Sequence, residues 1–258
     1  MAERSGHISI GHIILIIILS AVISISFLLP LYVHEEVVKS VGNYAPLYLY
    51  EHSPYGRIVV EVHYSPDAKP SGEALESLRY MLQQYTGKQV IVEQFQDIDP
   101  VIVPKKIDED NIFDFGESVL KDSGHYHMGW ISGDIPIYVL YVNSTAPDAQ
   151  IKKDNAVAGV SYRANSFVIF KNNIAIDSIE RSVLIHETGH LLGLDHDNDP
   201  SCVMTSVLVQ KPSWLAGKGS PPYEFCDDHM AELDDRRRNP FYAAFKNYGR
   251  IVSLFLPD

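Results

Sequence analysis

The sequence predicts an α/β protein built around a mixed sheet. Two segments with strand character, residues 58–64 and 89–95, flank an amphipathic helix pattern over residues 71–85. Further strand patterns follow at residues 135–142 and 156–170. Strands that alternate with helices in a chain of 258 residues indicate one modest globular domain plus appendages.

The remaining elements follow from local signals. Gly87 closes the first helix, the Pro- and Asp-rich residues 97–110 predict a loop, and a second helix is expected at residues 111–121. Another helix begins at Asp177, where an acidic residue three positions later resembles a capping pair. A last helix is expected at residues 224–238, with three Arg in its final turn where cations suit the helix dipole.

The N-terminal segment predicts a membrane anchor. Residues 8–33 contain no Asp, Glu, Lys or Arg and exceed the ~20 helical residues that cross a bilayer core. A cleaved signal peptide is the alternative. Because Arg4 precedes the segment and Glu35 follows it, the positive-inside rule places residues 1–7 in the cytoplasm. We therefore expect a single-pass protein of the cell membrane with an extracellular domain, or a secreted form if the segment is cleaved.

A stalk and one domain are expected after the anchor. Residues 34–56 contain Pro46, Pro54 and many Tyr without a clear period, which predicts the stalk, and residues 57–258 form the domain. The formal net charge of -12 disfavours general binding to nucleic acid, because phosphate repels an acidic chain. The sequence leaves the oligomeric state unknown.

The most informative stretch carries three histidines at fixed spacing. His186 and His190 lie one turn apart on the same face of a helix, so both can bind one metal ion. Glu187 lies about 100° around the helix from His186, where it can reach a water without being forced to ligate. Gly193 can end the helix in the left-handed conformation and return the chain, so that His196 becomes a third ligand. Three histidines with one open position are the layout of a catalytic zinc site.

The string H-E-x-x-H-x-x-G-x-x-H that ends at His196, followed by Met204, resembles the metzincin signature. The eight-residue distance from His196 to Met204 is similar to the matrixin and archaemetzincin branches. The resemblance implies a zincin-like fold, in which a mixed sheet carries an active-site helix, a Met-turn and a C-terminal helix, here preceded by one transmembrane helix. It also implies that Met204 packs beneath the imidazoles without binding the metal.

The chain departs from several branches of that family. Archaemetzincins carry further cysteines for a second zinc, starting directly after the third histidine, where this chain has Asp197. Ser206 stands where astacins have Tyr, and no cysteine precedes Cys202 to form a cysteine switch. The branch and any latency mechanism stay open.

The resemblance implies a zinc-dependent endopeptidase with one catalytic zinc ion and a peptide or protein substrate. Zinc lowers the pKa of a bound water to about 7, and Glu187 is expected to act as the general base. A catalytically silent zinc-binding module of the cell surface is the alternative, and an exopeptidase is a third possibility. Catalytically inactive relatives usually lose the general base or a metal ligand, whereas this chain keeps Glu187 and all three histidines.

Substrate-binding residues are expected on both sides of the histidine string. In metzincins an edge strand before the active-site helix binds the peptide as an added strand. Gly159, Val160 and Ser161 are the candidates here, and an interior strand is the alternative. Tyr223, in a Pro-rich segment, is the candidate for the wall of the specificity pocket, with a plain loop as the alternative.

Two cysteines, Cys202 and Cys226, are too few for a four-thiolate metal site. In an extracellular domain a disulfide between them would tie the Met-turn to the C-terminal helix and contribute roughly 3–4 kcal/mol. Two buried thiols are the alternative. We interpret Asp197 and its acidic neighbours as solvated turn residues, because the spacing of a calcium loop is absent. His229 has no assigned role.

Overall fold

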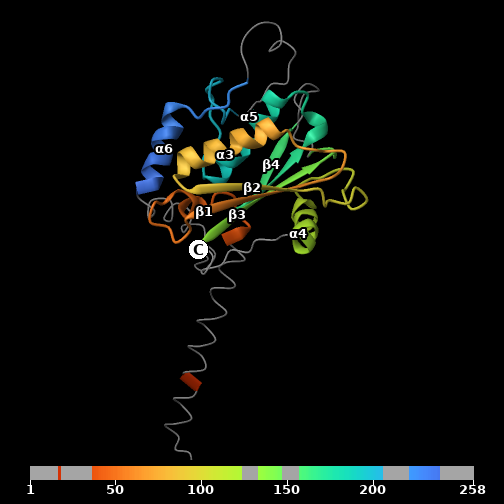
Figure 1. The fold of residues 1–258 in the computed structure, drawn as a ribbon, viewed down its shortest axis with the longest axis horizontal. Coiled ribbons are helices and arrows are strands. Elements are labelled where there is room, and N and C mark those ends of the chain that lie inside the picture. The colour runs from red at the N-terminus through yellow and green to blue at the C-terminus, as the bar shows by residue number, and fades with distance from the viewer. Residues whose placement is uncertain (1–16, 19–36, 124–132, 147–156, 206–220, 239–258) are drawn as a thin grey trace, which may run out of the picture.

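A computed structural model describes residues 17–18, 37–123, 133–146, 157–205 and 221–238 of the chain (Figure 1). The strands are β1 (Arg57–Tyr64), β2 (Gln89–Phe95), β3 (Asp134–Val142), β4 (Gly159–Arg163) and β5 (Ser166–Phe170). The helices are α2 (Ala45–Leu49), α3 (Gly72–Thr86), α4 (Ile112–Ser123), α5 (Asp177–Leu191) and α6 (Asp227–Arg238), with a 3-10 turn η1 (Lys171–Asn173). These bounds confirm the elements predicted from residue 58 onward, except that α6 begins three residues late. The backbone N–H of Val203 donates to the carbonyl of Glu224 at 2.9 Å. This hydrogen bond holds Glu224 against the loop after α5, and the helix starts only beyond it.

The five strands form one mixed sheet in the order β2-β1-β3-β5-β4. β1 pairs in parallel with β2 and β3, and β3 pairs in parallel with β5. β4 alone in this sheet runs antiparallel, paired with β5, and lies at an edge. The sheet and its helices fit the zincin-like arrangement expected from the resemblance.

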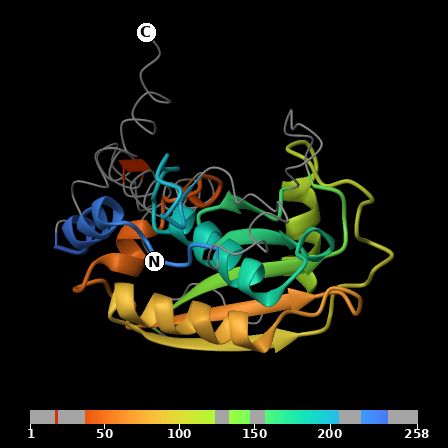
Figure 2. The same cartoon turned by 90° about the horizontal axis from the view of Figure 1, so that it is seen from above.

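Helices cover the two faces of the sheet (Figures 1 and 2). Alternate side chains of β3 and β5 point to opposite faces, which divides the buried apolar residues into two clusters. The larger cluster joins Tyr141 and Phe167 to α3 and α5. The smaller one joins Leu140 and Phe170 to α4. Because both faces are covered, β3 is buried along its whole length, as parallel strands usually are.

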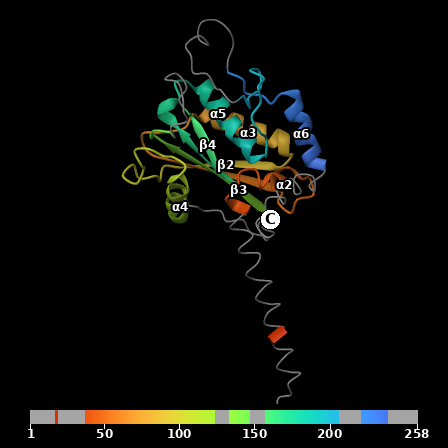
Figure 3. The ribbon, with the colours of Figure 1, turned by 180° about the vertical axis from the view of Figure 1, so that it is seen from behind.

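The predicted stalk, residues 34–56, needs correction where the structure describes it. Tyr44, Tyr48 and Leu49 are buried in the larger core cluster, and the Tyr48 hydroxyl donates to the Pro136 carbonyl at 2.9 Å. α2 contacts α3 and α6, and it lies beside α6 when the molecule is seen from behind (Figure 3). The tyrosines that showed no period in the sequence are core residues, so the folded domain begins well before Arg57.

A pair of glycines brings this N-terminal segment against the end of α5. A Cβ atom on Gly42 would lie 3.1 Å from the Cα of Gly193 and 3.4 Å from the His190 carbonyl oxygen. Both glycines have positive φ, at 80° and 87°, so neither the space nor the backbone suits another residue. Segments about 150 residues apart in the chain therefore meet backbone to backbone.

No helix in the described part of the chain combines the length and the apolar character that crossing a bilayer requires. The predicted anchor, residues 8–33, lies outside the described residues apart from Ile17 and Ile18. Both of these side chains are exposed.

Candidate metal centre and active site

α5 and the turn that follows it bring the three predicted histidines together. His186 and His190 lie on one face of α5, one turn apart. Gly193 adopts a positive φ of 87°, and the backbone N–H of Leu194 donates back to the Gly189 carbonyl at 2.9 Å. The chain then reverses, and His196 returns to the other two rings, as the spacing predicted.

The three imidazoles converge on one point through their Nε2 atoms. The Nε2 atom of His190 lies 3.2 Å from that of His186 and 3.2 Å from that of His196, and the third separation is 3.3 Å. A tetrahedral zinc ion with bonds of about 2.0–2.1 Å would hold its nitrogen donors about 3.3–3.4 Å apart. The separations of the protein atoms therefore fit zinc.

Hydrogen bonds at the other ring nitrogen, Nδ1, orient two of these imidazoles. His186 Nδ1 lies 2.7 Å from the Val203 carbonyl, and His190 Nδ1 lies 2.9 Å from the Leu194 carbonyl. Because a carbonyl only accepts, each Nδ1 carries the proton and each Nε2 presents a lone pair. Burial lowers the pKa of His186 to about 4 and lowers the pKa of His190. Both rings are therefore neutral donors at neutral pH, which is the form that binds a metal ion.

Glu187 is buried beside the edge strand of the sheet. Ser161 Oγ on β4 donates to Glu187 Oε2 at 2.8 Å and lies 3.1 Å from the Glu187 carbonyl. Burial raises the pKa of Glu187, while nearby His190 and the Ser161 hydrogen bond lower it. A carboxylate held in this way is suited to accepting and returning a proton near neutral pH.

The four predicted substrate-binding residues occupy different places. Gly159 and Ser161 lie against Glu187, and a Cβ atom on Gly159 would come 2.8 Å from Glu187 Cγ. Val160 packs against the smaller core cluster instead. Tyr223 stacks under the Arg181 guanidinium at 3.9 Å and lines a cavity of about 630 Å³ between α3 and α5. The three β4 residues therefore lie on an edge strand, whereas Tyr223 belongs to a separate part of the surface.

Met204 lies in the core below α5. It is fully buried, and a Cβ atom on Gly189 would lie 2.3 Å from its Sδ atom. Gly189 directly precedes His190, so Met204 packs against the helix at the level of the metal-binding rings. This is the position that the resemblance implied for it.

The predicted disulfide between Cys202 and Cys226 is not formed, because both cysteines are free thiols. Each Sγ atom contacts His229 Nδ1, at 3.3 and 3.2 Å, and the Cys226 backbone N–H donates to Cys202 Sγ at 3.2 Å. Asp197, interpreted as a solvated turn residue, also reaches this group. These four residues were not predicted from the sequence to form one group, although the interval of three from Cys226 to His229 is a metal-ligand spacing.

The fold and the three-histidine site define a domain of the zinc-metallopeptidase type. Residues 106–215 match the model of the matrixin family of peptidases. The chain is therefore similar to metzincin-like zinc metallopeptidases, in its site and across the segment that contains it.

Two solved structures are similar to this chain. The archaemetzincin from Methanopyrus kandleri is 16% identical, covering 71% of this chain and 96% of its own length at a TM-score of 0.49. The archaemetzincin from Archaeoglobus fulgidus, solved in complex with malonate, is 17% identical, covering 69% and 99% at a TM-score of 0.40.

Proposed function

We propose that this chain is a zinc-dependent endopeptidase that is anchored in a membrane. The observation that carries the proposal is the convergence of three imidazoles, through their Nε2 atoms, beside a buried carboxylate. His186, His190 and His196 would hold the ion. When bound, zinc would acidify a water molecule and polarise a peptide carbonyl.

The protein residues supply the proton transfer and the positioning. Glu187 accepts a proton at a carboxylate oxygen and later returns it to the amine that leaves. Ser161 holds that carboxylate through its hydroxyl, which fixes one oxygen by a 2.8 Å hydrogen bond. His196 is exposed whereas His186 is buried, so a substrate would approach from the His196 side.

β4 supports the choice of a peptide as the substrate. It is an edge strand, so one side of its backbone has no neighbouring strand in the described sheet. An extended peptide can add to such an edge through backbone hydrogen bonds. Since Gly159 and Ser161 lie directly against Glu187, a peptide bound there would pass the proposed general base.

The test replaces Glu187 with Gln in the full-length, detergent-solubilised chain. We expect zinc content to be unchanged while kcat/KM for internal cleavage of a peptide library falls by about 10²–10⁴-fold, the usual contribution of general acid–base catalysis. Glu109→Gln, at an exposed position, is the matched control and should retain full activity. Cleavage that survives in Glu187→Gln would contradict the role of Glu187. A zinc-loaded wild-type chain that cleaves no peptide would favour the silent binding module.

Membrane anchoring rests on residues 8–33, which contain no charged side chain. We expect the full-length chain to stay in the membrane fraction after an alkaline carbonate wash and to be released by detergent. A chain without residues 1–33 should be released by the wash. Full-length protein that leaves the membrane in carbonate would show that this segment is not a transmembrane anchor.

A further inference from the structure

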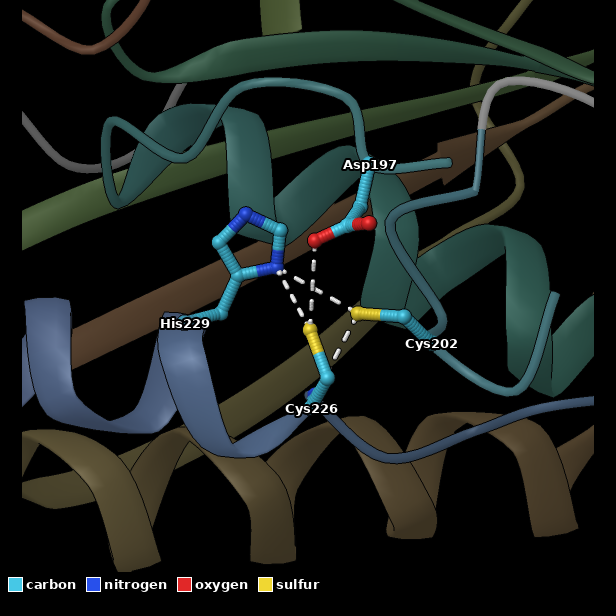
Figure 4. A group of neighbouring side chains, drawn as sticks. All are labelled: Asp197, Cys202, Cys226 and His229. Carbon is cyan, nitrogen blue, oxygen red and sulfur yellow. Dashed lines mark hydrogen bonds between the residues drawn. The ribbon is translucent and has the colours of Figure 1, made fainter. Parts of the chain in front are cut away.

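Four potential metal ligands from two parts of the chain converge next to the three-histidine site (Figure 4). Asp197 and Cys202 come from the loop after α5, Cys226 lies just before α6, and His229 lies in the first turn of α6. One donor atom from each lies within 4.8 Å of every other. Cys202 and His229 are buried, and the other two are half-buried.

The donors and their separations suit a tetrahedral zinc ion. The Cys226 Sγ atom lies 3.2 Å from His229 Nδ1 and 3.5 Å from Asp197 Oδ2, and Cys202 Sγ lies 3.3 Å from His229 Nδ1. A zinc ion bound by two thiolates, an imidazole and a carboxylate would hold its donors about 3.5–3.8 Å apart. These three separations are within a few tenths of an ångström of that geometry, and every other pair of donors lies within 4.8 Å. Thiolate and imidazole donors favour zinc over calcium or magnesium.

The group is directly connected to the three-histidine site through the backbone. Asp197 follows the ligand His196 in the chain, and its N–H donates to the Met204 carbonyl at 2.8 Å. Cys202 precedes Val203, whose carbonyl accepts the hydrogen bond from His186 Nδ1 at 2.7 Å. An ion that holds Asp197 and Cys202 in place would therefore also restrain His196, the Val203 carbonyl that orients His186, and Met204.

We infer that Asp197, Cys202, Cys226 and His229 bind a second, structural zinc ion that clamps the loop of residues 194–205 to the start of α6. All four positions of a tetrahedral ion are filled by protein atoms, which is the mark of a structural rather than a catalytic zinc. The ion ties together residues on each side of the undescribed segment 206–220. The site does not depend on the chain being a peptidase.

The main competing state is a disulfide between the two cysteines. Both sulfur atoms contact Nδ1 of His229. If the group binds a metal ion, the His229 imidazole and the Asp197 carboxylate serve as its other two ligands. If the two cysteines formed a disulfide, the half-buried Asp197 carboxylate and the buried His229 ring would not act as metal ligands. Mass spectrometry with and without reductant distinguishes the two states in purified protein.

The experiment counts metal ions in the full-length chain. We expect about two zinc ions per chain in the wild type, about one in His190→Ala, and about one in Cys226→Ser or His229→Gln. Asp228→Asn, an exposed neighbour of His229, is the control and should retain both ions. A wild type with one ion that Cys226→Ser does not remove would overturn the inference.

Cobalt substitution supplies a readout that needs no catalytic activity and is measured first on the wild-type chain. The wild-type chain loaded with Co²⁺ should show an intense thiolate-to-cobalt absorption band in the near ultraviolet, because two of the inferred ligands are sulfur. The band should persist in His190→Ala, which disrupts only the three-histidine site. Absence of the band in fully loaded wild type, or an intact disulfide in the zinc-loaded chain, would refute the site.

Discussion

Gly189 allows α5 to pack closely over Met204, and replacing it with Ala tests how this packing supports the metal centre. The new methyl group would lie 2.3 Å from Met204 Sδ and 3.0 Å from a ring carbon of Phe225. Ala is favoured over Gly in a helix by about 1 kcal/mol, but forcing a methyl group into a filled core costs typically 1–3 kcal/mol. The buried methionine must shift, so we expect a net loss of up to about 2 kcal/mol in the free energy of unfolding.

The consequence for the metal is measurable separately. Met204 directly follows Val203, whose carbonyl accepts the hydrogen bond from His186 Nδ1, so a shift of Met204 disturbs the orientation of that ligand. Loss of ligand orientation typically lowers metal affinity by about 10–100-fold. Urea unfolding of the zinc-free chain gives the stability, and competition with a chelator gives the zinc affinity. Gly72→Ala, where a Cβ atom meets nothing within 4 Å, is the control. If Gly189→Ala matches that control in both measurements, the packing role of Met204 is wrong.

Three further predictions test other parts of the structure. Ser161→Ala removes a hydrogen bond that lowers the pKa of Glu187, so the acidic limb of the kcat/KM profile should move to higher pH with zinc content unchanged. Burial lowers the pKa of His63, but hydrogen bonds to Glu61 and Asp97 outweigh it, and the net shift is upward. The resulting stability is full below about pH 6.5 and is lost as pH rises through the folded pKa, so His63→Gln should destabilise the zinc-free chain more at about pH 5.5 than at about pH 8.5 in urea unfolding. A chain that starts at Arg57 should lack the near-ultraviolet circular dichroism of a packed core, whereas one that starts at Val37 should keep it, because burial of a large apolar side chain of α2 such as Leu49 contributes about 1.5–3 kcal/mol.

The fold from residue 58 onward was predictable because its signals are local. Runs of β-branched residues, helical periodicity and Gly87, which ends α3 with a φ of 68°, are all read from neighbouring positions. The three histidines were predictable for the same reason, since a helix and one turn fix their spacing within eleven residues.

Tertiary contacts decided the features that were missed. Glu180 does not cap α5, whose N-cap, Ile176, has no side-chain hydrogen bond. It is buried instead and accepts hydrogen bonds from the Ser71 backbone at 2.8 Å and the Tyr141 hydroxyl at 2.9 Å, and it pairs with Lys171. No local sequence pattern indicates that Ser71, 109 residues earlier in the chain, and Tyr141 are its partners.

The Asp197 group was hidden for a related reason. Its two halves are separated by 24 residues between Cys202 and Cys226, and two cysteines in isolation indicate a disulfide as readily as a metal site. Their true neighbours become visible only when α6 is placed against the loop after α5. The burial of residues 37–50 is another case, since the tyrosines there follow no period and are buried by α3 and α6.

The contact between Gly42 and Gly193 has a mechanical consequence. Two backbones that meet with no side chain between them form a stiff joint, because there is no flexible group to absorb displacement. Gly42 precedes α2 and β1 in the chain, so a displacement of the segment around Gly42 would act directly on the turn before His196 and not by way of the sheet.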